Sequence, residues 1–212
     1  MSQPSKRSAN IPAPGKLDDS LGEFWVDNPW DIINEGHNLS AFERSRTFLN
    51  LRGRGFLDVS YLSGADDDGD GRCVVAGDFR NVGRLDVLVR KVGGQPLQLY
   101  ENNFPQKHYL KVTLRGTRGN RQGVGARLVA VVKGQQLVRE MYPANSNRSQ
   151  MPNIVHFGLG DQERVERLTV RWPNGEEQVL TDLPGDRHIV IEEGKKGAAA
   201  VETVKPGETI RP

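Results

Sequence analysis

HYLKVTLRGTRGNRQGVGARLVAVVKGQQLVREMY, residues 108–142, opens the stretch that decides the fold of this chain. The stretch continues to residue 192, and three strings mark it: NRQGVGAR (120–127), VHFGLG (155–160) and VRWPNG (170–175). Short apolar runs alternate here with Gly, Asn, Asp and Pro, which is the punctuation of β-strands joined by turns. KGQQ (133–136) and PNGE (173–176) predict hairpin turns, the second through its Asn-Gly pair.

The apolar runs predict an all-β fold class. In the clearest run, Leu168, Val170 and Trp172 alternate with polar neighbours, the period-two pattern of a strand with one buried face. No segment has the pattern of a long amphipathic helix, and the strands are most simply arranged as two antiparallel sheets packed as a sandwich. The strands are predicted at residues 46–51, 73–79, 85–90, 96–102, 109–115, 126–133, 136–142, 154–158, 164–171, 177–183 and 188–192.

Composition limits the function classes. The 212 residues carry 29 basic and 27 acidic side chains, so the net charge of +2 gives no global attraction to nucleic acid or to an anionic membrane. No apolar run approaches the length of about eighteen residues needed for a membrane span. Residues 1–20 lack the apolar core of a secretory signal. The single cysteine, Cys73, has no partner for a disulfide and lies in the apolar run CVVA, which predicts a small buried core residue.

The three strings, in this order and spacing, resemble the ASPIC/UnbV domain of the cartilage-acidic-protein family. Residues 44–89 are similar to the region that precedes this domain in the family, including one degraded FG-GAP repeat of the VCBS type. The resemblance implies an extracellular or cell-envelope location and an adhesion-type role in binding protein or carbohydrate. A propeller needs about four to eight blades, so a single blade-like hairpin is expected to be attached to an edge of the sandwich.

The chain is predicted to have four parts. Residues 1–20 form a flexible arm, 21–105 an aromatic segment with the degenerate blade, 106–194 the ASPIC/UnbV-like domain, and 195–212 a tail in which 201–204 form a short strand. The aromatic segment should pack on the folded domain, because its large apolar residues would otherwise be exposed to water. These residues are Phe24, Trp25, Trp30, Ile32 and Ile33.

An acidic run is the candidate metal site. Asp66, Asp68, Asp70 and Gly71 satisfy D-x-D-x-D-G, the opening of a calcium loop in which alternate carboxylates face one centre. The closing ligand expected in such loops is missing from its usual position, and Asp78 could supply it only from a shifted loop. Two interpretations therefore stand: a Ca²⁺ site that stabilises the fold, or a solvated acidic turn.

A second loop, DFRNVGRLD at residues 78–86, resembles the FG-GAP calcium loop DFDNDGDLD. Arg80 and Arg84 replace acidic positions of that pattern, and guanidinium groups repel a dication. We expect no metal there. Instead, one of the two arginines should pair with Asp78 or Asp86 and take over the structural role of the cation.

The expected binding surface consists of polar loops, residues 115–125 and 142–152. NRQGVGAR lacks the third glycine of a dinucleotide fingerprint and precedes a strand, which predicts a tight turn with Gly123 and Gly125 at special backbone angles. No stacking aromatics accompany the arginines, so nucleic acid is not the expected partner. The candidate contact residues are Arg115, Arg118, Arg121, Asn145, Asn147 and Arg148.

We expect a protein that is not an enzyme, because no catalytic motif is present. The leading hypothesis is a binding module for protein or carbohydrate. The first alternative is a structural subunit of a larger assembly. The second is a glycoside-active enzyme that uses two of the carboxylates between Asp66 and Asp86.

Overall fold

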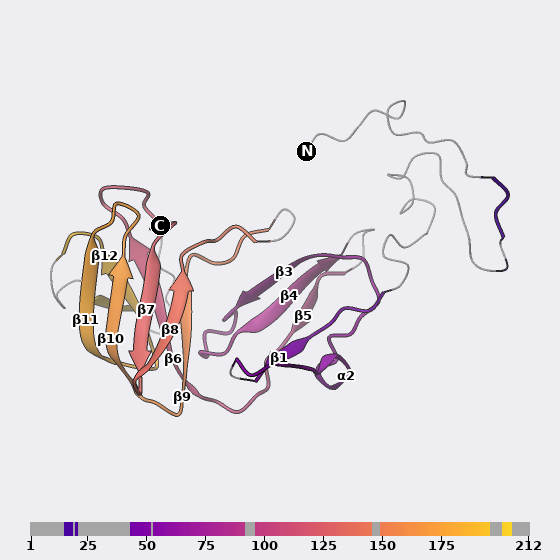
Figure 1. Cartoon of the computed structure of the whole chain (residues 1–212), viewed down its shortest axis with the longest axis horizontal. Helices are drawn as coiled ribbons and strands as arrows, with labels where there is room; N and C mark the ends of the chain where they lie inside the picture. The colour runs from indigo at the N-terminus through magenta and orange to yellow at the C-terminus, as the bar shows by residue number, and fades with distance from the viewer. Residues whose placement is uncertain are drawn as a thin grey trace. The chain divides into compact units, whose positions relative to one another are not determined.

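The computed structural model describes residues 15–18, 20, 43–51, 53–91, 96–145 and 149–195, together with the backbone of 201–204. The chain divides into two units (Figure 1). The N-terminal unit comprises Met1–Arg72 and Arg90–Leu97, and the sandwich unit comprises Cys73–Val89 and Gln98–Pro212. Nearly all of the predicted arm and tail, and the whole aromatic cluster at residues 24–33, lie outside the described residues.

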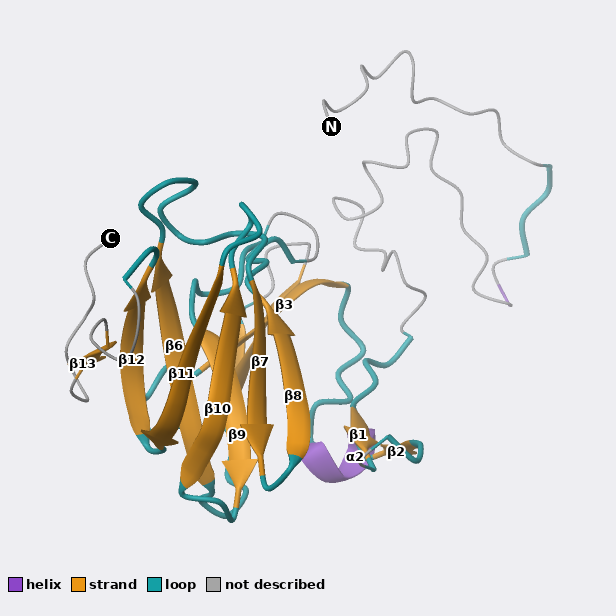
Figure 2. Ribbon diagram, turned by 60° about the vertical axis from the view of Figure 1, so that its left-hand side comes forward, coloured by secondary structure: helices purple, strands orange, loops and turns teal. Residues whose placement is uncertain are grey.

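Two four-stranded sheets form the sandwich (Figure 2). The first has the order β11-β10-β7-β8 and the second the order β13-β12-β6-β9. The strands of the first sheet are β7 (Arg127–Val132), β8 (Gln135–Glu140), β10 (Arg164–Arg171) and β11 (Glu177–Pro184). Those of the second are β6 (His108–Arg115), β9 (Val155–Gly160), β12 (Arg187–Glu192) and β13 (Val201–Val204). The all-β class and the sandwich are therefore confirmed.

The period-two pattern of the strands builds one continuous core. Leu110, Val112 and Leu114 of β6 face inward, and Leu168 and Val170 of β10 face them from the other sheet. Trp172 is also buried, and its Nε1 donates a hydrogen bond of 2.6 Å to Gln178 Oε1. The Gln178 amide in turn donates to the carbonyls of Glu192 and Lys195, so this polar pair links the two sheets.

One strand pair corrects the expected topology. β6 and β12 run parallel, with Leu110 opposite Arg187 and Arg115 opposite Glu192. The prediction of two wholly antiparallel sheets is wrong at this pair. A strand has the same pattern of apolar residues whether its neighbour runs parallel or antiparallel. The sequence therefore did not show that β12 pairs with β6 in the parallel direction.

A smaller sheet has the order β3-β4-β5, with β3 at Gly71–Gly77, β4 at Asp86–Lys91 and β5 at Gln98–Tyr100. In β3, Cys73 is only partly buried, so the prediction of a buried core cysteine is wrong. Neither face of β3 is completely buried.

The N-terminal unit contains a two-stranded hairpin and one helical turn. β1 (Phe48–Asn50) pairs antiparallel with β2 (Phe56–Asp58), and α2 (Ser60–Ser63) follows. The sequence pattern predicted β1 within a longer run at residues 46–51. It predicted neither β2 nor α2, which stand alone as three and four residues and are too short to show a period. None of the helices in the described ranges is long and apolar enough to cross a membrane.

Candidate functional site

The candidate binding loops meet at one end of the sandwich, which we call the loop end (Figure 2). The β6–β7 loop and the β8–β9 loop are joined there by two backbone hydrogen bonds, from Gly125 N to Met141 O and from Met141 N to Ala126 O, each 2.8 Å. The β10–β11 turn reaches the same end, because Arg118 forms an ion pair with Glu176. The structure thus brings together the two polar loops that the sequence predicted to form the binding surface.

A buried carboxylate fixes the shape of the β6–β7 loop. Glu193 is 4% exposed, and its Oε2 accepts hydrogen bonds from the backbone N–H groups of Thr117 (2.7 Å) and Arg118 (2.9 Å). Its Oε1 accepts a bond of 2.9 Å from Asn174 Nδ2. The backbone N–H of Arg118 is the main cause that lowers the pKa of Glu193, so the carboxylate stays ionised and holds the loop at neutral pH.

Glycines make the turn NRQGVGAR possible. Gly123 and Gly125 have φ values of +64° and +93°, which confirms the special backbone angles expected from the sequence. A Cβ on Gly123 would lie 2.9 Å from Leu114 Cβ. The Asn120 side chain closes the turn, because its Oδ1 accepts from Val124 N at 2.6 Å and its Nδ2 donates to Val124 O at 2.9 Å.

The side chains that project from this fixed loop are polar. Arg115, Arg118 and Arg121 are exposed, and Arg118 is directed to Glu176. From the β8–β9 loop, Tyr142 is 68% exposed, a large aromatic side chain that the sequence analysis did not single out as a contact residue. The loop end therefore carries exposed guanidinium groups and an exposed aromatic ring.

Asn145 has a structural contact of its own. It is exposed, and its Nδ2 donates hydrogen bonds to the carbonyl of Val74 and, at 3.5 Å, to Met151 Sδ. An isolated bridge between Ala144 and Gln150 closes this loop. The other two residues predicted for the surface, Asn147 and Arg148, lie outside the described residues.

The residues predicted for a metal are found in different settings. Asp66 Oδ2 lies 3.0 Å from Arg44 Nη2, while Asp78 Oδ2 lies 2.8 Å from Lys111 Nζ. Asp68 is exposed and Asp70 is 5% exposed. Within the described ranges, no three His, Cys, Asp or Glu side chains are placed to hold a metal ion. The calcium site remains a prediction, and the carboxylates at 66 and 78 have protein cations as partners.

The predicted pairing of an arginine with an acid of this loop is confirmed between Arg80 and Asp86. This carboxylate is fully buried, and Arg80 donates to both of its oxygens, at 2.7 and 3.2 Å. Burial acts to raise the pKa of Asp86. The hydrogen bonds from Arg80 and from Asn102 N outweigh it, so the pKa is lowered. Arg80 also reaches the carbonyl of Asn102 at 3.1 Å and thereby ties the β3–β4 loop to the segment after β5.

A buried polar cluster on the outer face of β6 was not predicted. Lys111 contacts Asp78 and Asn81, and both members of the Lys111–Asp78 pair have side chains no more than 5% exposed. Beside them, His156 stacks on Tyr109 with ring centroids 6.0 Å apart, and its Nε2 lies 2.9 Å from Gly83 O. The available signal was Lys111 itself, a charged residue between Leu110 and Val112 in the middle of its strand.

Comparison with known proteins supports part of the resemblance. Residues 116–198 match a family model described as ASPIC and UnbV, which covers the sandwich from the β6–β7 loop to beyond β12. No curated protein matches the chain. Over residues 116–198 the chain is therefore similar to ASPIC and UnbV domains, and the matched stretch is rich in β-strands.

Proposed function

We propose that this chain is a non-enzymatic binding module that recognises a protein or carbohydrate ligand through the loop end of its sandwich. The observation that carries the proposal is the fixed β6–β7 loop, in which buried Glu193 holds the backbone while arginines project outward. Binding residues commonly lie on loops that a rigid scaffold positions. Tyr142 adds a rigid aromatic contact, a side chain that loses little conformational entropy on binding.

The arrangement suits a polar ligand. Guanidinium groups donate paired hydrogen bonds to carboxylates, and an exposed ring packs on the apolar face of a sugar or of a peptide side chain. The resemblance to the cartilage-acidic-protein family, with residues 44–89 as one FG-GAP-type blade, would place this binding outside the cell. The polar loop end and the family resemblance both support an adhesion-type function.

The glycoside-active alternative has weaker support. Such an enzyme needs one carboxyl group with a raised pKa as general acid, beside a second carboxylate about 5 to 10 Å away. The pKa of Asp86 is lowered, and Asp66 and Asp78 lie against Arg44 and Lys111. A lowered pKa does not suit a general acid, so Asp86 fits this role poorly. The ion pairs with Arg44 and Lys111 give Asp66 and Asp78 structural contacts.

The binding proposal is tested by profiling the full chain against glycan arrays and panels of extracellular-matrix and envelope proteins. Arg121→Glu combined with Tyr142→Ala should weaken binding to a detected ligand at least tenfold, a loss of about 1.4 kcal/mol. Both side chains are exposed, so the fold should be unaffected.

The matched control is Lys133→Glu. Lys133 is exposed in the β7–β8 turn, at the opposite end of the same sheet, and should leave affinity unchanged. Equal losses in both variants would show that net charge, and not the loop end, governs binding. No binding to any sugar or protein of the panels would count against the module itself and favour a structural subunit, which gel filtration of the native complex would reveal.

A further inference from the structure

The N-terminal unit exposes a dense group of large apolar side chains, which we call the hairpin surface. Tyr61 and Leu62 of α2 are 86% and 83% exposed, and Phe56 of β2 is 70% exposed. The strands β1 and β2 have no buried residue. The hairpin surface consists of Phe48, Leu49, Leu51, Phe56, Leu57, Tyr61 and Leu62.

We expect another segment or molecule to bury these exposed apolar side chains. An isolated two-stranded hairpin is marginal in water, and contiguous exposed apolar patches mark interaction sites. The seven side chains come from a segment of only fifteen residues. Leu49 and Leu57 lie on one face of the hairpin and Phe48 and Phe56 on the other, so both faces expose large apolar side chains. Burial of these side chains would stabilise a hairpin that cannot bury them by itself.

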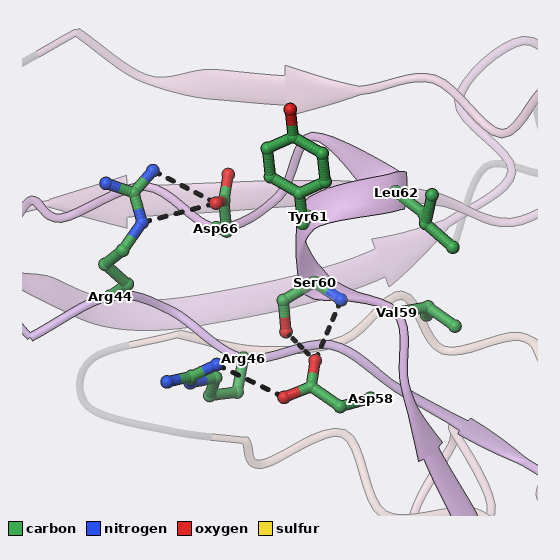
Figure 3. A pocket seen from close by; sticks show the side chains of 8 residues that line it. All are labelled: Arg44, Arg46, Asp58, Val59, Ser60, Tyr61, Leu62 and Asp66. Carbon is green, nitrogen blue, oxygen red and sulfur yellow. Dashed lines mark hydrogen bonds and ion pairs between the residues drawn. The ribbon is translucent and has the colours of Figure 1, made fainter.

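The charged residues beside the hairpin surface form ion pairs with one another (Figure 3). Arg44 pairs with Asp66 at 3.0 Å, and Arg46 pairs with Asp58 at 3.2 Å. Together with α2 they line a recess of about 250 Å³. This volume lies below the roughly 300–1,000 Å³ of small-molecule sites, which favours a covering peptide over an enclosed ligand.

The chain itself contains a segment with the matching chemistry. Residues 24–33 read FWVDNPWDII and carry Phe24, Trp25, Trp30, Ile32 and Ile33. The flanking and intervening acids are Glu23, Asp27, Asp31 and Glu35, and no Lys or Arg occurs from residue 17 to residue 43. The exposed Arg54, in the turn between β1 and β2, adds a third arginine near the hairpin surface to Arg44 and Arg46. The segment therefore supplies apolar side chains that match the hairpin surface, while Arg44 and Arg46 are already paired with Asp66 and Asp58.

We propose that residues 24–33 dock on the hairpin surface of the same chain and complete the N-terminal unit. The linker of about ten residues to Glu43 can span at most roughly 35 Å, so the segment is held close to the surface. Tethering by a short linker gives an effective concentration in the millimolar range, which favours the intramolecular contact over an equal contact with another molecule. Apolar contacts supply the stability of this docking, and the short linker keeps the segment near the hairpin surface.

The test uses tryptophan accessibility in the full chain. The chain has three tryptophans, and Trp172 is 2% exposed in the sandwich core, so acrylamide quenching reports on Trp25 and Trp30. In the wild type both should be shielded. In Tyr61→Asp with Leu62→Asp, their emission should shift to the red and become quenchable, because the apolar contact is lost. Tyr142→Asp, at a side chain of similar exposure in the sandwich unit, should leave quenching unchanged.

A reciprocal measurement does not depend on fluorescence. Trp25→Ala with Trp30→Ala should accelerate amide hydrogen exchange across residues 48–62 and leave the strands of the sandwich protected. Equal quenching of wild type and of the Tyr61→Asp, Leu62→Asp variant would overturn the proposal. So would shielding that disappears on dilution together with a fall in mass by light scattering, which would identify a second copy as the occupant.

Discussion

At the scale of single residues, the buried carboxylate of Asp78 in the sandwich unit accepts hydrogen bonds at both of its oxygens. Asp78 contacts Lys111 and also accepts from the backbone N–H groups of Val82 and Gly83, each at 2.8 Å. A buried ion pair is stable only when its remaining valences are satisfied, and here the loop backbone satisfies them. Lys111 also affects a neighbour, because it lies opposite His188 in the β6–β12 register.

His188 should make stability depend on pH. Burial, and then the charge of Lys111, lower its pKa from 6.5 to about 4, while Asp78 acts in the opposite direction. The folded state therefore favours neutral imidazole. Its contribution is complete above pH 6.5 and is lost as the pH falls from there to about 4, up to about 3 kcal/mol.

Urea unfolding at pH 7.5, 6.0 and 4.5 checks this expectation. His188→Gln, which keeps a hydrogen-bonding partner for Thr113, should lose less stability over this range than the wild type. His156, whose pKa is lowered chiefly by burial, adds a loss of the same sign in both proteins. Parallel pH profiles for the two proteins would contradict the assignment to His188.

At the scale of elements, the β3–β4 loop is fastened to the outer face of the second sheet within the sandwich unit. Gly83 is the closest point, since a Cβ there would lie 2.1 Å from the ring of Tyr109. The loop is held at its other side by Arg80 and Asp86. A loop that resembles a calcium loop is thus fixed by protein cations on both of its acidic ends.

Gly83→Ala should destabilise the chain by about 2–4 kcal/mol, because it adds steric overlap to a φ of +83°. The matched control is Gly134→Ala, at a φ of +71° with open space around it, which should cost only about 1 kcal/mol of backbone strain. Chemical denaturation of both variants measures the difference. Equal losses would mean that Tyr109 moves aside without cost.

At the scale of the whole molecule, calcium is expected to have little effect on stability. Arg44 and Lys111 already neutralise Asp66 and Asp78, and Lys91 forms an ion pair with Asp67. We therefore expect the same melting temperature in excess calcium and in chelator.

The contrary outcome is also specific. A bound ion at about a hundredfold excess over its dissociation constant would add roughly 2.7 kcal/mol of stability. A calcium-dependent rise in melting temperature that Asp68→Asn abolishes would establish the acidic run as a metal site. Asp68 suits this test because it is exposed.

By itself the sequence determined the all-β class, most of the strands, the two hairpin turns and the glycine-dependent turn at residues 120–127. These features depend on side-chain period and on local backbone angles, which neighbouring residues set. It also indicated that Arg80 or Arg84 would replace a metal, because the charges in that loop are adjacent along the chain.

Only the tertiary structure decided which distant residues meet. The parallel β6–β12 pair, the Lys111–Asp78 contact and the seat of Glu193 beneath the β6–β7 loop each join residues more than thirty positions apart. Cys73 was expected in the core but is partly exposed. The sequence did not show which elements would pack against its strand. Burial depends on what packs against a strand, and a strand's own apolar pattern shows which side could be covered but not which element covers it.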